Sequence, residues 1–229
     1  MNASLKSWAL KLGLLSLSAL LLAACSMSKP HERAAQAKAD AAGLTALQQA
    51  SFDGTFVAQG AKFSQYRKLL VEQLDMEDVN ILQPSSNRMR MEKPWVLSDK
   101  DKLYYQERYT EALINNLVVD GSYATAMDAA PDVLRVRARV VQIAPLASKD
   151  DSDGRPGIMK VYSEGFGTMA LELSLYDSVS GKVLAIITDQ RDLGRIWEEN
   201  NRALNNRQVR LAFNAWLGKL RTELQRLSH

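Results

Sequence analysis

The chain has 229 residues, and its 29 lysine and arginine residues nearly balance its 26 aspartate and glutamate residues, which gives a formal net charge of +3. Lys6 and Lys11 lie in an N-terminal segment that we expect to be removed, and the remainder would then carry 27 basic and 26 acidic residues, or +1. A charge this small provides no extended positive field for DNA or RNA, so we expect no nucleic acid partner.

The N-terminal segment has the pattern of a bacterial export signal. The two lysines supply positive charge, residues 14–22 form a short apolar run, and two alanines precede the only cysteine of the chain. An apolar run of about ten residues is too short to remain as a membrane-spanning helix. The stretch Leu22-Ala23-Ala24-Cys25 resembles the lipobox of bacterial lipoproteins.

This resemblance implies that residues 1–24 are a signal peptide cleaved after Ala24 and that Cys25 then carries acyl chains. One chain binds a bilayer only marginally, at about 0.8 kcal/mol per buried methylene, whereas three would anchor the protein almost permanently. Ser26 stands where aspartate would signal retention in the inner membrane. We therefore expect a lipid-anchored protein at the outer membrane of a Gram-negative bacterium, facing the periplasm. The alternative is an ordinary secretory signal followed by a coincidental cysteine.

A lipidated Cys25 would leave no thiol for a disulfide, a catalytic thiolate or a zinc site. We therefore expect no cofactor apart from the covalent lipid, and stability from packing alone.

Residues 25–60 are predicted to form an alanine-rich tether after the lipidated cysteine. The apolar side chains of this stretch are small, so its hydrophobic periodicity is weak. A short helix is expected over residues 32–42, and Gly43 would end it. Residues 61–229 are predicted to form a single globular domain.

Two longer helices are predicted in the domain. Ser98 and Asp101 have the spacing of a capping box, and apolar residues then recur at helical spacing as far as residue 118. A second apolar stripe runs along residues 201–227.

Strands are predicted from alternating apolar and polar residues. The clearest lie over residues 132–143 and 168–176, and the second continues through a tight turn into residues 182–188 as an antiparallel hairpin. Weaker patterns cover residues 66–75 and 123–127, and the glycine-rich segment 145–167 is predicted to be a loop. The fold class is therefore α+β, an antiparallel-rich sheet with the two main helices packed on one face.

The order of these segments resembles a family of bacterial outer-membrane lipoproteins grouped only as a domain of unknown function. The resemblance rests on the lipobox, the tether, and three strand sequences: Tyr66-Arg67-Lys68-Leu69-Leu70-Val71, Leu134-Arg135-Val136-Arg137 and Lys182-Val183-Leu184-Ala185. It implies location and fold over nearly the whole mature chain. The family supplies no assigned activity or catalytic residues.

The sequence gives little support for catalysis. Its two histidines, His31 in the predicted tether and His229 at the C-terminus, are not expected to be held beside a serine or a metal. We therefore expect no enzymatic activity. The alternative is a hydrolase of envelope polymers that uses Asp189, Asp192 or Glu164, which would require two carboxyl groups about 5–9.5 Å apart in one cleft.

The acidic run at residues 150–154 suggests a calcium loop, but lysines occupy two ligand positions, Lys149 and Lys160. We therefore expect no metal site there.

Three arginines, Arg135, Arg137 and Arg139, are predicted on one face of one strand, about 6.6 Å apart at ~3.3 Å per residue. They could bind the phosphate or carboxylate of an envelope glycolipid or peptidoglycan. The alternative is a solvent-facing set of ion pairs with acids such as Glu172.

Two further groups of residues could form sites. Alternating charges indicate salt bridges around a turn, with the rim of a cleft as the alternative. Aromatic residues could form a platform for stacking sugars, although tyrosine on a helix face is more often a core or rim residue. The first group is Asp189, Arg191, Asp192 and Arg195, and the second is Trp95, Tyr104, Tyr105 and Trp197.

These patterns favour a non-enzymatic binding module that serves envelope assembly or maintenance. Its partners would be the membrane, through the acyl chains, and an envelope protein or glycan. An accessory subunit of a transport or secretion system is the other non-enzymatic alternative.

Overall fold

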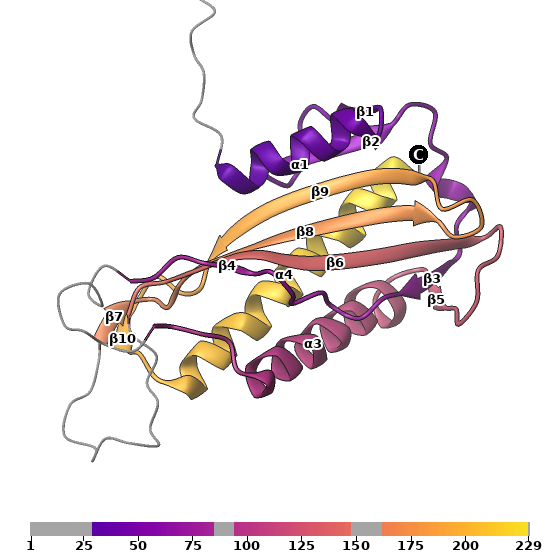
Figure 1. Ribbon diagram of the computed structural model, residues 1–229. Helices are drawn as coiled ribbons and strands as arrows, with labels where there is room; N and C mark the ends of the chain where they lie inside the picture. The colour runs from indigo at the N-terminus through magenta and orange to yellow at the C-terminus, as the bar shows by residue number, and fades with distance from the viewer. Residues whose placement is uncertain (1–28, 85–93, 148–161, 229) are drawn as a thin grey trace, which may run out of the picture. The chain divides into compact units, whose positions relative to one another are not determined.

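The computed structural model describes residues 29–84, 94–147 and 162–228. Its centre is an eight-stranded mixed sheet in which seven strands follow the order β1-β2-β9-β8-β6-β3-β5, and β4 pairs with β6 beside β3 (Figure 1). The strands are β1 (Leu44–Ala46), β2 (Gly54–Ala58), β3 (Lys68–Val71), β4 (Asn80–Ile81), β5 (Ala124–Thr125), β6 (Val133–Pro145), β8 (Gly167–Asp177) and β9 (Val183–Asp192).

The three long strands β6, β8 and β9 form an antiparallel centre, as their alternating sequences predicted. β6 pairs with β8 so that Arg139 faces Glu172, and β8 pairs with β9 across the predicted hairpin. By contrast, β3 and β4 run parallel to β6, and β5 runs parallel to β3. The strands predicted over residues 66–75 and 123–127 are present as β3 and β5, which are shorter than predicted.

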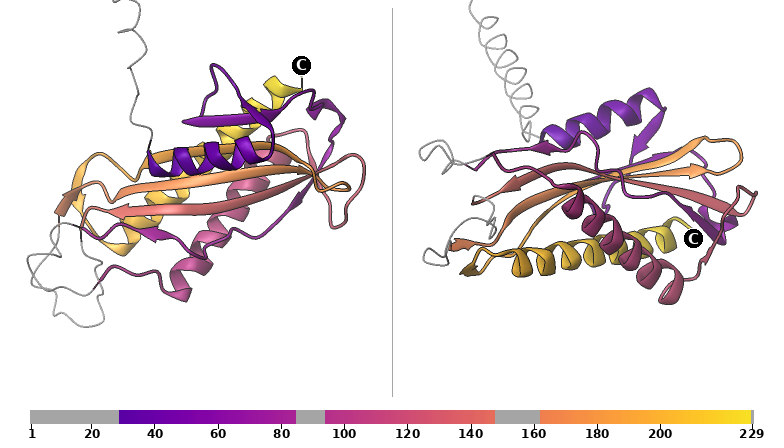
Figure 2. Two further views of the ribbon diagram at one scale, coloured as in Figure 1. Left: turned by 45° about the horizontal axis from the view of Figure 1, so that its top comes forward. Right: turned by 60° about the horizontal axis from the view of Figure 1, so that its bottom comes forward.

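Two helices, α3 (Asp99–Leu113) and α4 (Arg202–Leu227), cover one face of the sheet (Figure 2). Ser98 begins α3 with the predicted capping box: the Asp101 backbone N–H donates to its side chain, and the Asp101 carboxylate accepts from its backbone N–H. A π-helical turn, η2 (Ile114–Val119), continues α3. The α+β class with two helices on one face is therefore confirmed.

A third helix, α1 (Pro30–Ala41), lies on the opposite face of the sheet (Figure 2). It buries Ala35 and Ala39 against the strands, in a cluster with Phe56 and Ile186. Lys38 also reaches the carboxylate of Glu172 on β8, at 2.7 Å.

The predicted domain boundary at residue 61 is wrong, because β2 pairs along β9 within the main sheet. The folded unit begins at His31. The helix predicted over residues 32–42 is present, but it packs on the sheet. Alanine side chains give a weak hydrophobic pattern, so the burial of this segment depends on partners that are distant in sequence.

The segment predicted as a loop between residues 145 and 167 contains a strand, β7 (Tyr162–Glu164). It pairs antiparallel with β10 (Trp197–Glu199) in a separate two-stranded sheet.

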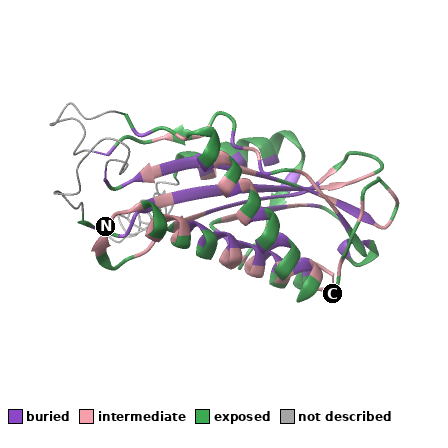
Figure 3. Cartoon of the chain, turned by 90° about the horizontal axis from the view of Figure 1, so that it is seen from below, coloured by how far each residue is buried: buried purple, intermediate pink, exposed green. Residues whose placement is uncertain are grey.

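The central strands are buried along most of their length, whereas the outer faces of the helices are exposed (Figure 3). Phe213 of α4 lies at the centre of the larger core, in contact with the rings of Tyr105, Tyr109 and Trp216.

Candidate functional site

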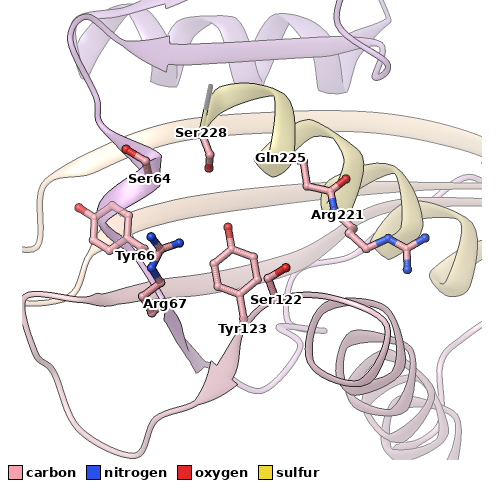
Figure 4. A pocket seen from close by; sticks show the side chains of 8 residues that line it. All are labelled: Ser64, Tyr66, Arg67, Ser122, Tyr123, Arg221, Gln225 and Ser228. Atoms are coloured by element: carbon pink, nitrogen blue, oxygen red, sulfur yellow. The ribbon is translucent and has the colours of Figure 1, made fainter.

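A pocket of about 490 Å³ lies where the last turns of α4 meet the segments that precede β3 and β5 (Figure 4). Its wall is rich in hydroxyl groups and includes two guanidinium groups. The lining residues are Ser64, Tyr66, Arg67, Ser122, Tyr123, Arg221, Gln225 and Ser228.

Backbone hydrogen bonds hold Arg67 in place between two strands of the sheet. Its N–H donates to the carbonyl of Asp132 at 2.8 Å, and its own carbonyl accepts from the N–H of Ala124 at 3.0 Å. Because Arg67 directly precedes β3, the pairing of β3 with β6 and β5 fixes the start of its side chain.

The two arginines differ in their partners. Arg221 lies 3.8 Å from the carboxylate of Asp120, an ion pair that satisfies part of its charge. In the part of the chain that the structure describes, no carboxylate forms an ion pair with Arg67. Its guanidinium group lies beside the ring of Tyr123 (Figure 4). Arg67 is therefore the group in this pocket best suited to an external anion.

The tyrosines of the pocket remain protonated at neutral pH. Burial raises the pKa of Tyr123, although a hydrogen bond with Ser228 and the nearby charge of Arg67 oppose that rise. Burial also raises the pKa of Tyr66, whose hydroxyl donates to Asp177 at 2.9 Å. Both tyrosines are therefore neutral, and the positive charge of Arg67 beside them suits a carboxylate or phosphate.

The strand arginines predicted as an anion site form ion pairs with acids that follow β3. Glu172, the predicted partner, lies on β8, on the other side of β6. Arg135 and Arg137 both contact the carboxylate of Glu72, and Arg139 lies 3.8 Å from Asp75 and 3.9 Å from Asp78. This is the ion-pair alternative with different partners, since Glu172 is bound by Lys38. The parallel pairing of β3 with β6, which the sequence did not predict, brings these acids beside the arginines.

Asp189, a predicted hydrolase residue, is almost fully buried and both its oxygens are occupied. One accepts from the backbone N–H of Asp53 at 3.0 Å, and the other accepts from the indole of Trp216 at 2.9 Å and from Lys219 at 3.0 Å. The carboxylate therefore ties β9 to α4 and to the segment before β2.

The other members of the charged group at the end of β9 lie at the surface. Asp192 pairs with Arg195 three residues later, as the salt-bridge interpretation expects, and Arg191 is half-buried. Glu164, the third predicted carboxylate, is exposed on β7.

The four aromatic residues considered as a sugar platform lie in different environments. Trp95 and Tyr105 are buried in the main core, and Tyr104 donates to the carbonyl of Asn206 at 3.0 Å. Trp197, by contrast, is exposed on β10. These four residues therefore do not form one platform, and the core interpretation holds for Trp95 and Tyr105.

His31 lies in α1 and is buried, so its placement in a tether was wrong. Its ring nitrogens and the carboxylates of Glu32 and Asp53 offer ligand atoms within 4.8 Å of one another. Among the described residues, this is a group whose donor atoms could hold a divalent cation.

The family to which the chain belongs is shown by its sequence. A model of the family named "Protein of unknown function (DUF3313)" matches residues 35–220. The chain belongs to the DUF3313 family. The expected resemblance to a domain of unknown function is thus confirmed, and no curated protein sequence matches the chain.

Solved structures resemble this DUF3313 chain at low identity. One is the PelC dodecamer from Paraburkholderia phytofirmans, with 12% identity, a TM-score of 0.39, and coverage of 73% of this chain and 98% of that chain. Another is a Xanthomonas campestris protein of the DUF330 family, with 13% identity, a TM-score of 0.43, and coverage of 70% and 85%. A third is a homolog of neuraminyllactose-binding hemagglutinin from Helicobacter pylori, with 12% identity, a TM-score of 0.34, and coverage of 74% and 86%.

In the described part of the DUF3313 chain, no helix combines the length and the apolar character needed to cross a bilayer. Several predicted positions lie outside the described residues: Ala24, Cys25, Ser26, the acidic run with Lys149 and Lys160, and His229.

The sequence does not predict the pocket. Its serines and Gln225 follow no periodic pattern, and Arg67 belongs to a predicted strand with no sign of a site. The available signal was a cluster of Ser, Tyr and Arg at the starts of two predicted strands, which becomes a site only once β3, β5 and α4 converge.

Proposed function

We propose that the chain is an outer-membrane lipoprotein, anchored through Cys25 and facing the periplasm, whose folded unit binds an anionic envelope ligand without chemical catalysis. The observation that carries the binding part is the guanidinium of Arg67, which has no carboxylate partner among the described residues and lies in a pocket rich in hydroxyl groups. The lipobox supports the anchoring part. Envelope assembly or maintenance is the class of role that fits both.

The composition of the pocket supports binding rather than catalysis. None of its lining residues is a histidine, a cysteine, an aspartate or a glutamate. General acid–base catalysis needs a group whose pKa lies near the working pH. The two tyrosines that line the pocket have pKa values raised further above neutrality, so they do not supply such a group.

The ligand chemistry follows from the donors that the pocket presents. A guanidinium binds carboxylate and phosphate oxygens through paired, charge-assisted hydrogen bonds, and hydroxyl groups complement the hydroxyls of a saccharide. An acidic glycan of the envelope meets both requirements. A protein partner that presents an acidic side chain is the other outcome that the experiment distinguishes.

Direct binding tests the role of Arg67. Titration calorimetry with inorganic phosphate and with glucuronate should show binding to the unaltered protein, and Arg67→Gln should weaken it at least about tenfold, the equivalent of ~1.4 kcal/mol. The matched control is Arg207→Gln, which removes an exposed arginine near the start of α4. Equal affinity of Arg67→Gln and the unaltered protein would refute the proposed site.

Capture in living cells identifies the natural ligand class. A photo-crosslinking residue at Gln225 should capture a glycan or a protein, whereas the same residue at exposed Leu211 should not. The anchoring part is tested separately: Cys25→Ala should release the protein from the membrane fraction, and its persistence there would contradict lipid anchoring.

A further inference from the structure

Exposed apolar side chains gather at one end of the sheet, where β6 ends, β8 begins and β9 ends. Backbone hydrogen bonds join the segments of this region. The N–H of Leu82 donates to the carbonyl of Ile143 at 2.9 Å, and the N–H of Gly165 donates to the carbonyl of Ile196 at 3.0 Å. The exposed residues in these segments are Leu82, Val96, Leu146, Tyr162, Ile196 and Trp197.

The small sheet of β7 and β10 carries the largest of these side chains. Trp197 faces Glu164 across the two strands, and Glu199 faces Tyr162. Trp197 and Tyr162 are therefore diagonal neighbours on the same face of the pair, within reach of each other. Trp197 is 69% exposed and the preceding Ile196 is 72% exposed, so neither side chain is part of the core.

The folded unit also begins at this end. His31 and Glu32 offer atoms within 4.8 Å of the Asp53 carboxylate, and that carboxylate accepts from the N–H of Gln190 at 3.1 Å. Gln190 lies near the end of β9, two residues before Asp192. The start of α1, the end of β9 and the β7–β10 pair lie toward the same end of the sheet in two views (Figures 1 and 2).

The distance from the anchor is short. Five residues lie between Cys25 and His31, and the six peptide steps that join the two positions span at most about 20 Å when fully extended. The tether predicted up to residue 60 would have allowed a reach several times longer. Acyl chains on Cys25 would therefore hold this end of the folded unit close to the lipid headgroups.

We propose that this end of the folded unit contacts the bilayer, with Trp197, Tyr162 and Ile196 at the membrane interface. The inference rests on the proposed lipid anchoring and adds the surface that faces the lipid. Tryptophan and tyrosine favour the headgroup region because each combines an apolar ring with a polar group.

The composition of this end fits a lipid surface better than a glycan. Leu82, Leu146 and Ile196 have no group that could bond to a sugar hydroxyl, whereas all three gain from burial in acyl chains. Glu164, Glu198 and Glu199 lie on the same two strands. Because a carboxylate is costly to bury in hydrocarbon, the contact reaches only the interface.

Tryptophan fluorescence can test this contact in the processed lipoprotein. The chain has four tryptophans: Trp8 would leave with the signal peptide, and Trp95 and Trp216 are buried in the fold. Trp197 is therefore the exposed reporter. In vesicles of phosphatidylethanolamine and brominated phosphatidylcholine, we expect its emission to shift to the blue, to be quenched by the bromine, and to be protected from aqueous iodide.

Two variants make the result specific. Trp197→Phe should abolish the quenching by brominated lipid. Adding Met127→Trp to that variant moves the reporter to the opposite end of the sheet, next to β5. There its emission should be quenched by aqueous iodide and not by brominated lipid.

Equal iodide access to Trp197 in the vesicle-bound lipoprotein and in the unlipidated Cys25→Ala protein in buffer, without bromine quenching, would overturn the proposal. Protection from iodide that persists without any bromine quenching would also overturn it and point to a protein or glycan cover. Mass spectrometry of the same sample shows whether Cys25 is acylated, so a failure of the anchor is distinguished from a failure of the contact.

Discussion

The network around Asp189 gives the sharpest prediction about stability. This carboxylate is 3% exposed and receives hydrogen bonds from the backbone of Asp53, from the fully buried indole of Trp216 and from Lys219. Replacing Asp189 with alanine leaves three donors without their acceptor. Two of them, the indole and the ammonium group, belong to α4, so the change weakens the attachment of that helix to β9.

The magnitude follows from the surroundings of each donor. Losing a buried hydrogen bond to a charged acceptor costs about 1.5–3 kcal/mol, and breaking a buried ion pair costs about 3–5 kcal/mol. The side chain of Lys219 is 32% exposed, so water can solvate part of its charge. We therefore expect Asp189→Ala to lower the free energy of unfolding by about 3 kcal/mol. Asp189→Asn, which keeps one acceptor, should lose about half as much.

Urea denaturation followed by tryptophan fluorescence measures these losses. The matched control is Asp192→Ala, three residues further on, whose side chain pairs at the surface with Arg195. Exposed pairs contribute about 0–1 kcal/mol, so the control should change stability little. A loss below about 1 kcal/mol for Asp189→Ala, or one equal to that of Asp192→Ala, would refute the reasoning.

Three further predictions concern buried tyrosines and a strained glycine. The hydroxyl of Tyr109 is buried and has no hydrogen-bond partner among the described residues, so Tyr109→Phe should raise the free energy of unfolding by about 1 kcal/mol; a loss in thermal or urea stability would contradict this. Burial raises the pKa of Tyr105 above its ordinary value of about 10, and the unfolded chain therefore loses this proton first as the pH rises. Stability should be intact below pH ~10 and fall above it by about 1.4 kcal/mol per pH unit for this tyrosine, and Tyr105→Phe should make the fall in urea midpoint shallower. Gly167 has a φ of +109°, and an added Cβ would lie 2.0 Å from the carbonyl oxygen of Ala144, so Gly167→Ala should cost at least about 2 kcal/mol. Gly181→Ala, at a φ of +68° with open space around it, should cost only about 1 kcal/mol, and similar losses for the two would argue against the steric explanation.

The candidate site could be predicted only in part. The sequence correctly suggested ion pairs for Arg135, Arg137 and Arg139 as one of two alternatives, but it named Glu172 as the partner. Which acid lies beside a given arginine depends on which strands are neighbours in the sheet. The alternation of apolar and polar residues along one strand does not indicate its neighbours. The parallel pairing of β3 with β6 places Glu72 there, while α1 brings Lys38 to Glu172.

The sequence by itself determined the elements whose side chains repeat with a clear period. The alternation along β6, β8 and β9, the apolar stripe of α4 and the capping box at Ser98 each report burial on one face of one element. These local patterns sufficed for the α+β class.

Only the tertiary structure decided where residues 31–58 lie and which side chains form the pocket. Ala35 and Ala39 are small, so their burial depends on Phe56 and Ile186, which belong to strands distant in sequence. The pocket around Arg67 is likewise made by three separate segments that contribute polar residues without any period. Contacts between distant segments arise from the packing of whole elements, so the periodicity of residues within one element cannot predict them.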